Sequence, residues 1–272
     1  MTYVGFLALF LVGPILLLTA VLEYRRRDQQ FDAFFRVWRR AVVFHAAIAL
    51  AYTTPWDNFL VARGVWTYDP ARVIGWVIGW VPIEEYAFFV LQPLLVGMWG
   101  ALLWKVPEGK WTLSSARSGR WRWTLGIAGL GLWIANLMIW RVWGSPWVYM
   151  GLILVWGLPP LILQLLFGGD LLWSRRGDLL RIWIPPALFL SAADALAIRE
   201  GIWRISGDWS TGWKMLGLPV EEGVFFFLTS LLIANGSLLM VLPESRARLR
   251  RIQEMVRLSS ADPGARKKER LS

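Results

Sequence analysis

The chain has 272 residues, of which 56% are hydrophobic, and a net charge of +10 with only 18% charged residues. Ordinary soluble domains contain roughly 45–50% apolar residues, so this composition indicates an integral membrane protein. The absence of cysteine excludes disulfides, iron–sulfur clusters and thiol nucleophiles. The single histidine, His45, excludes metal sites built from several histidines. We therefore expect no metal site, and no cofactor-binding motif is evident.

In chain order, seven stretches are approximately long and apolar enough to cross a bilayer, whose hydrocarbon core takes about 20 residues of helix. The second stretch is the shortest, and it continues into a Thr-Pro-Trp-Asp sequence. The expected fold is all-α and integral to the membrane, with about seven transmembrane helices. The predicted spans are Tyr3–Leu22, Ala41–Thr54, Ile78–Trp104, Trp121–Trp140, Trp147–Phe167, Leu179–Ile198 and Leu216–Leu242.

The positive charges alternate between the two sides that these spans define. Of the 29 Lys and Arg residues, 6, 5 and 3 fall in the first, third and fifth connections and 9 in the C-terminal tail. The second, fourth and sixth connections hold only 2, 1 and 3. By the positive-inside rule, we expect a multi-pass protein of the cell membrane with its N-terminus outside and its tail in the cytoplasm.

The segment after Pro243 is basic, and we predict a largely disordered arm beside anionic lipid headgroups. No stacking platform or recognised nucleic-acid motif accompanies this charge, so we expect no nucleic-acid partner.

An internal repeat organises the chain. The pattern Asp57, Gly-Val-Trp, Gly-Trp, Pro-x-Glu-Glu and Phe-Phe recurs 137 residues later, starting at Asp194, without a gap. Four spans separate corresponding helices, so the two halves run in the same direction, as parallel repeats about an axis along the membrane normal. The predicted organisation is a three-span repeat over 1–105, a linking loop and fourth span over 106–144, a second three-span repeat over 145–243 and a basic tail over 244–272.

Two pairs of adjacent glutamates lie at the mouths of two predicted membrane helices. Acids in the first turn of a helix complement its dipole, so the pairs could be simple interfacial caps. Apolar residues flank both pairs, however, and carboxyl groups inside a membrane are costly and usually functional. Adjacent helical residues point about 100° apart, so one Glu of each pair can face the bundle. We take as candidate acids and bases Glu84, Glu85, Glu221 and Glu222, and secondarily Asp57 and Asp194.

Aromatic residues surround these acids in the sequence. The tryptophans could form an interfacial belt, and some phenylalanines could face lipid. Beside a buried acid, aromatic faces can also stabilise a carbocation. His45 has no counterpart in the other half, and we expect a structural role for it. The candidate substrate-binding residues are Trp66, Phe88, Phe89, Trp203, Phe225 and Phe226.

The motifs together resemble the lycopene cyclase domain of bacteria, archaea and fungi, in the form that fuses its two small subunits. They are Thr54-Pro55-Trp56-Asp57-Asn58, Gly64-Val65-Trp66, Pro82-Ile83-Glu84-Glu85 and Pro219-Val220-Glu221-Glu222.

This resemblance implies a redox-neutral cyclisation of the open ends of lycopene, or of a related acyclic carotenoid, into β-ionone rings. One Glu of a pair would act as the acid, with Asp57 or the second Glu as base or relay. The substrate would come from the bilayer, and the chain could associate with other carotenoid-pathway enzymes or with itself.

Two alternatives stay open: a non-catalytic carotenoid- or isoprenoid-binding membrane protein, and a proton-coupled transporter. A retinal protein would need a lysine in the last span, and Leu216–Leu242 contains none. A carotene-cleaving oxygenase would need several histidines for iron. Glu-to-Gln changes at the pairs should abolish a cyclase but spare binding by a scaffold.

Overall fold

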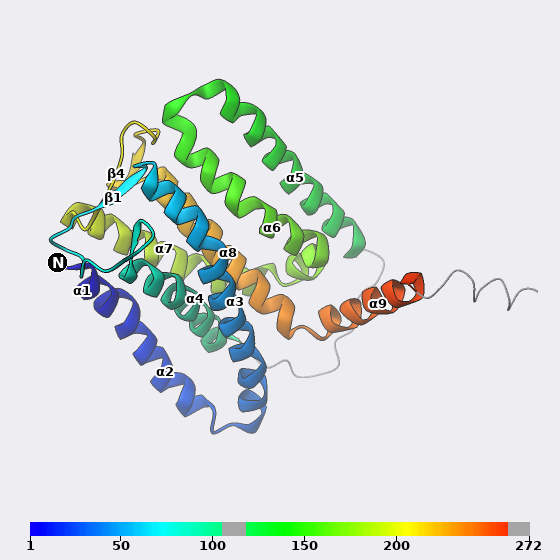
Figure 1. Ribbon diagram of the computed structural model, residues 1–272. Helices are drawn as coiled ribbons and strands as arrows, with labels where there is room; N and C mark the ends of the chain where they lie inside the picture. The colour runs from blue at the N-terminus through cyan, green and yellow to red at the C-terminus, as the bar shows by residue number, and fades with distance from the viewer. Residues whose placement is uncertain (105–117, 261–272) are drawn as a thin grey trace, which may run out of the picture.

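The computed structural model describes residues 1–104 and 118–260, and it is a bundle of long helices with a few short strands at one end (Figure 1). The all-α membrane fold is thereby confirmed. The helices are α1 (Tyr3–Leu7), α2 (Gly13–Arg25), α3 (Gln29–Ala62), α4 (Ile83–Leu103), α5 (Ser118–Trp143), α6 (Val148–Ser174), α7 (Arg176–Glu200), α8 (Val220–Val241) and α9 (Pro243–Ser260), with a π-helical turn η1 (Ala8–Val12) and a 3₁₀ turn η2 (Ser145–Trp147).

Six helices in the described part of the chain are long and apolar enough to cross a membrane. They are the continuous helix Tyr3–Arg25, α4, the Gly119–Ile139 part of α5, α6, α7 and α8. The second predicted span lies in α3, which is less apolar and is not among the six. Its place in the bundle comes from packing on α4 and α8. A Cβ atom at Gly97 of α4 would lie 2.4 Å from the Val42 side chain, so glycine permits this close approach.

The third and seventh predicted spans start too early. Residues before α4 form an antiparallel hairpin of β2 (Val77–Ile78) and β3 (Val81–Pro82), and those before α8 form the matching hairpin of β5 (Lys214–Met215) and β6 (Leu218–Pro219). The residues that lead from each hairpin into its helix are apolar, so hydropathy cannot place the helix start. The proline at the end of each hairpin is the N-cap of the helix that follows, and its backbone dihedrals lie in or near the extended region. Each Glu pair therefore lies in the first helical turn.

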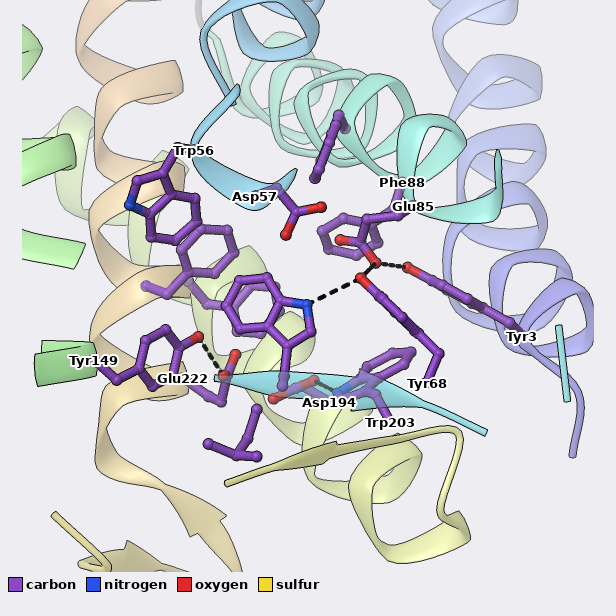
Figure 2. Close-up of a pocket in the computed structure, with 15 residues that line it drawn as sticks. Tyr3, Trp56, Asp57, Tyr68, Glu85, Phe88, Tyr149, Asp194, Trp203 and Glu222 are labelled. Atoms are coloured by element: carbon purple, nitrogen blue, oxygen red, sulfur yellow. Dashed lines mark hydrogen bonds between the residues drawn. The ribbon is translucent and has the colours of Figure 1, made fainter. Parts of the chain in front are cut away.

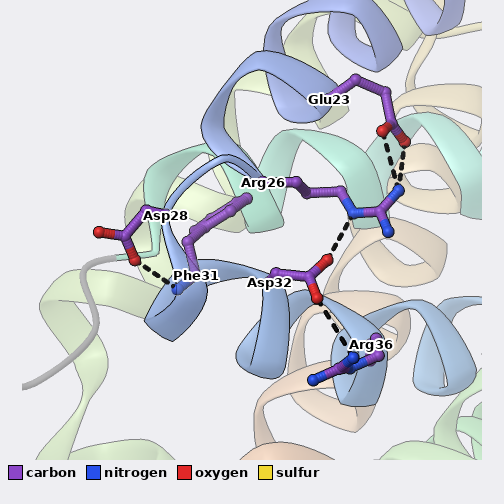
Figure 3. A network of polar contacts seen from close by, with 6 residues as sticks. All are labelled: Glu23, Arg26, Asp28, Phe31, Asp32 and Arg36. Atoms are coloured by element: carbon purple, nitrogen blue, oxygen red, sulfur yellow. Dashed lines mark hydrogen bonds and ion pairs between the residues drawn. The ribbon is translucent and has the colours of Figure 1, made fainter.

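The turn between α2 and α3 carries a network of charged residues (Figure 3). Asp28 is the N-cap of α3, and its side chain accepts a 2.8 Å hydrogen bond from the Phe31 amide. Arg26 pairs with Glu23 and with Asp32, and it lowers the pKa of the Asp32 carboxyl below the ordinary value. These contacts fix the reversal of the chain between the first two long helices.

The prediction of a disordered tail is wrong for its first part. Residues from Pro243 to Ser260 form α9, and residues 261–272 lie outside the described chain. Arg248 anchors this helix, because its guanidinium contacts both carboxylate oxygens of buried Asp170 on α6, at 2.8 and 2.6 Å. An ion pair between distant segments is invisible in sequence composition, which showed only the basic charge.

The two halves meet about a pseudo-twofold axis. Strands β1 (Trp66–Tyr68) and β4 (Trp203–Ile205) occupy matched positions of the repeat, and they pair antiparallel with Thr67 opposite its own counterpart, Arg204. In the same way, Gln92 of α4 donates a 2.7 Å hydrogen bond to its counterpart Thr229 of α8. Helix α5 lies outside this arrangement and packs mainly on α6 (Figure 1).

Candidate active site

A small cavity of about 50 Å³ lies where the first turns of α4 and α8 meet the β1–β4 pair (Figure 2). Residues of both halves line it, including Tyr3 near the start of the chain. Among the described residues, no lysine or arginine lines it. Its lining residues are Tyr3, Trp56, Asp57, Trp66, Tyr68, Glu85, Phe88, Phe89, Tyr149, Asp194, Trp203, Ile205, Glu222, Phe225 and Phe226.

The second glutamate of each pair faces this cavity. Tyr3 donates a 2.5 Å hydrogen bond to Glu85, and Tyr149 donates a 2.5 Å hydrogen bond to Glu222. Glu85 also accepts a 3.0 Å hydrogen bond from Tyr68, whereas Ile205 occupies the matched position in the other half. Burial raises the pKa of the Tyr68 phenol well above its ordinary value, so this phenol stays a neutral donor. The two glutamates therefore have related but unequal surroundings (Figure 2).

The first glutamate of each pair faces away from the cavity and holds the preceding loop. Glu84 accepts a 2.5 Å hydrogen bond from the Ile74 amide, and Glu221 accepts one of 2.6 Å from the Thr211 amide and one of 2.7 Å from its hydroxyl. Both side chains are buried, so neither Glu lies among headgroups. Their contacts point to a positioning role.

Both predicted aspartates line the cavity, but they differ in their hydrogen bonds. Asp194 accepts a 2.9 Å hydrogen bond from the Trp203 indole. The matched indole, Trp66, donates instead to the Tyr68 hydroxyl at 3.2 Å. As a result Asp57 is buried with no hydrogen-bond partner among the described residues, and its Oδ2 atom is fully enclosed.

All six aromatic residues singled out in the sequence line the cavity. Trp76, Trp80 and Trp213 are exposed, which an interfacial belt requires. His45 lies elsewhere, on α3, with its Nδ1 atom 2.7 Å from the Ala41 carbonyl oxygen.

Sequence reasoning missed the three tyrosines and Trp56. Tyr3 and Tyr149 are structural counterparts, since each lies in the first turn of the first helix of its half and donates a hydrogen bond to the equivalent glutamate. Their spacing hides this, because Pro14 follows Tyr3 by 11 residues whereas Pro159 follows Tyr149 by 10. The π-helical turn Ala8–Val12 lies between Tyr3 and Pro14, and a turn of this kind accommodates one additional residue. A comparison of the halves that allowed one insertion would have found the pair.

The chain matches the lycopene cyclase family over residues 1–103 and 145–239, which contain every residue that lines the cavity. It belongs to the lycopene cyclase family. It is 38% identical to a lycopene beta-cyclase of Halobacterium salinarum, in an alignment that covers 88% of this chain and 95% of the relative.

The fungal relatives are longer proteins than this chain. A bifunctional lycopene cyclase/phytoene synthase of Podospora anserina is 31% identical, with 76% of this chain and 36% of the relative aligned. One of Aspergillus oryzae is also 31% identical, over 70% of this chain and 32% of the relative. No solved structure matches the chain.

Proposed function

We propose that this protein is a membrane-bound lycopene cyclase that converts the open ends of lycopene into β-ionone rings by acid–base chemistry, without net redox change. The cavity supports this proposal, because its described lining residues combine four carboxyl groups with aromatic walls and include no cationic side chain. The named relative that aligns over 88% of the chain supports the substrate. In class the reaction is an intramolecular isomerisation, and we propose that the carboxyl groups of the chain suffice without a cofactor.

The hydrogen bonds divide the carboxyl groups by role. Four charged carboxylates in one apolar cavity would repel one another strongly, so the site holds fewer charges than carboxyl groups. Hydroxyl donors favour the charged form of a carboxyl group. Glu85 has two such donors, Tyr3 and Tyr68, so we assign it as the carboxylate base. Asp57 has none, so we assign it as the protonated acid. This reverses the division inferred from sequence, which gave the acid role to a glutamate.

The proposed steps balance without any other reactant. The Asp57 carboxyl protonates the terminal double bond and leaves a tertiary carbocation. The neighbouring double bond attacks this cation and closes the ring, and Glu85 takes a proton from a ring carbon. Return of that proton from Glu85 to Asp57 resets the site. Aromatic faces such as those of Trp56 and Phe88 stabilise the cation, and a dry cavity prevents water from trapping it.

Pigment analysis in bacteria that accumulate lycopene tests this function. We expect the wild-type chain to yield γ- or β-carotene with the mass of lycopene. Asp57→Asn should lower product formation by at least about 10²-fold, the usual contribution of a general acid. Glu254→Gln, which removes an exposed carboxyl group on α9, is the matched control and should leave conversion unchanged. Unconverted lycopene, with the wild-type protein present in the membrane, would contradict the proposal.

A further inference from the structure

A second, larger cavity adjoins the carboxyl site. It is a groove of about 550 Å³ lined by side chains of α3, α4, α6, α8 and α9, and this volume is within the range of small-molecule sites. Phe89 and Phe225 line both cavities, so the groove ends where the carboxyl site begins. The carboxyl cavity alone has room for only one or two water molecules. A substrate that reacts there must therefore keep most of its length elsewhere.

The groove has the shape of a site for a long chain. On α8 its lining runs from Phe225 to Met240, about 22 Å at 1.5 Å per helical residue. On α3 the lining side chains Phe44, Ile48 and Tyr52 follow one helical face. Half or nearly half of each of these three side chains is exposed, so the groove opens laterally toward the bilayer.

Several hydrogen-bond donors of the groove walls are used within the protein, although Ser245 and Arg246 of α9 also line the groove. Gln92 donates to Thr229, Thr229 donates to the Phe225 carbonyl, and Gln164 donates to the Leu232 carbonyl. The Tyr52 hydroxyl donates to the Trp156 carbonyl at 2.8 Å. The surface left for a ligand is mainly hydrocarbon and aromatic.

A stack of flat rings connects the groove to the carboxyl site. The rings of Trp56 and Trp156 are stacked with centroids 4.6 Å apart, and Tyr52 stacks on Trp156 at 5.5 Å. Phe225 lies parallel to Trp56 at 5.9 Å. Trp56 lines the carboxyl site, and Tyr52 and Trp156 line the groove. Aligned ring faces suit a flat conjugated chain better than a kinked acyl chain.

We propose that this groove holds the polyene chain of an acyclic carotenoid, with the terminal group passing between Phe89 and Phe225 into the carboxyl site. The inference rests on the proposed function, because the proposed reaction in the carboxyl site is the reason to expect a carotenoid in the adjoining groove. Lateral opening lets the hydrocarbon enter from the bilayer. The outer walls, far from the carboxyl groups, then decide how well the substrate binds without taking part in the chemistry.

Two substitutions on the same helix test the proposal. Ala49 lines the groove on α3, whereas Ala47 is exposed and is not part of its lining. Ala49→Trp should fill the groove, and Ala47→Trp is the matched control of equal bulk. Both are placed in a Glu85→Gln chain, so that bound substrate is not converted, and purified from cells that accumulate lycopene.

The measurements are lycopene bound per protein and its induced circular dichroism, which an achiral pigment acquires only in a chiral site. We expect the Ala49→Trp chain to bind about tenfold less lycopene, because the added indole would occupy the space that the substrate fills. The Ala47→Trp chain should match its parent in binding and in melting temperature. Equal lycopene in both chains, or phospholipid in the groove in place of lycopene, would overturn the proposal.

Conversion by the active chains separates this proposal from the proposed function. If wild-type chains cyclise lycopene and Ala49→Trp does not slow them, the groove proposal fails and the cyclase stands. If bound lycopene is lost only with Ala49→Trp but wild-type chains convert none of it, the groove stands and the cyclase fails.

Discussion

The Tyr68 hydroxyl is the clearest difference between the two halves at the level of single residues. It donates to Glu85 at 3.0 Å, and the matched position holds Ile205, which has no donor. The paired glutamates, the aspartates and the aromatic walls could all be predicted from the repeat. The different roles of the two halves could not be predicted, because they depend on which side chains contact each other across the β1–β4 pair.

Replacement of Tyr68 by Phe tests this division. Hydrogen bonds to charged groups contribute about 1.5–3 kcal/mol, so Tyr68→Phe should lower turnover by about 10- to 100-fold. The acidic limb of the pH–activity profile should also move to higher pH, because the carboxylate form of Glu85 loses a donor. Turnover is measured on lycopene in detergent-solubilised membranes.

Tyr24→Phe is the control for Tyr68→Phe, since Tyr24 is 68% exposed and lies far along the first helix. An unchanged turnover and an unchanged profile in Tyr68→Phe would show that Glu85 does not depend on this donor.

At the scale of elements, most of the long helices follow from hydropathy, whereas their ends and the ordered first part of the tail do not. Apolar residues lead from the β2–β3 and β5–β6 hairpins into the helices that follow, so the predicted spans began within the hairpins, at Ile78 and Leu216. Helix α9 is charged, and an ion pair between Arg248 and Asp170 attaches it to α6.

Removal of Arg248 tests how α9 is held. The Asp170 side chain is 1% exposed, so Arg248→Met leaves a buried charge without a partner. Breaking a buried pair in this way costs about 3–5 kcal/mol, and we expect a lower melting temperature in detergent. Arg250→Met, at an exposed position of α9, should melt like the wild type.

The double variant Asp170→Asn/Arg248→Met should recover much of the stability lost in Arg248→Met, because no unpaired charge remains. If the single and double variants melt at the same temperature, the ion pair is not what stabilises α9.

At the scale of the whole molecule, the repeat predicted a parallel pair of halves, and the β1–β4 pairing and the Gln92–Thr229 contact show them meeting about one axis. The position of the shared cavity at that axis was not predictable, since the offset of 137 residues says nothing of how the halves face each other. Orientation in the membrane stays a prediction from the charge distribution, which places the carboxyl site toward the outside and α9 in the cytoplasm.

Cysteine labelling tests this orientation directly, because the native chain has no cysteine. Asp208→Cys, in the loop beside β4, should react with a membrane-impermeant maleimide in intact spheroplasts. Glu254→Cys, on α9, should react only after permeabilisation. The opposite pattern would invert the topology. Both positions are exposed, so a lack of labelling does not reflect burial.

We propose that both halves build one site, in which Glu85 is the base. The most direct test of this claim is pigment analysis of lycopene-accumulating cells that express Glu85→Gln, Glu222→Gln or the double variant at equal membrane levels. We predict that Glu85→Gln alone forms neither γ- nor β-carotene, because the cavity has no second complete set of groups. If Glu85→Gln and Glu222→Gln each still cyclise lycopene and only the double variant is silent, each half carries its own site and the claim is contradicted.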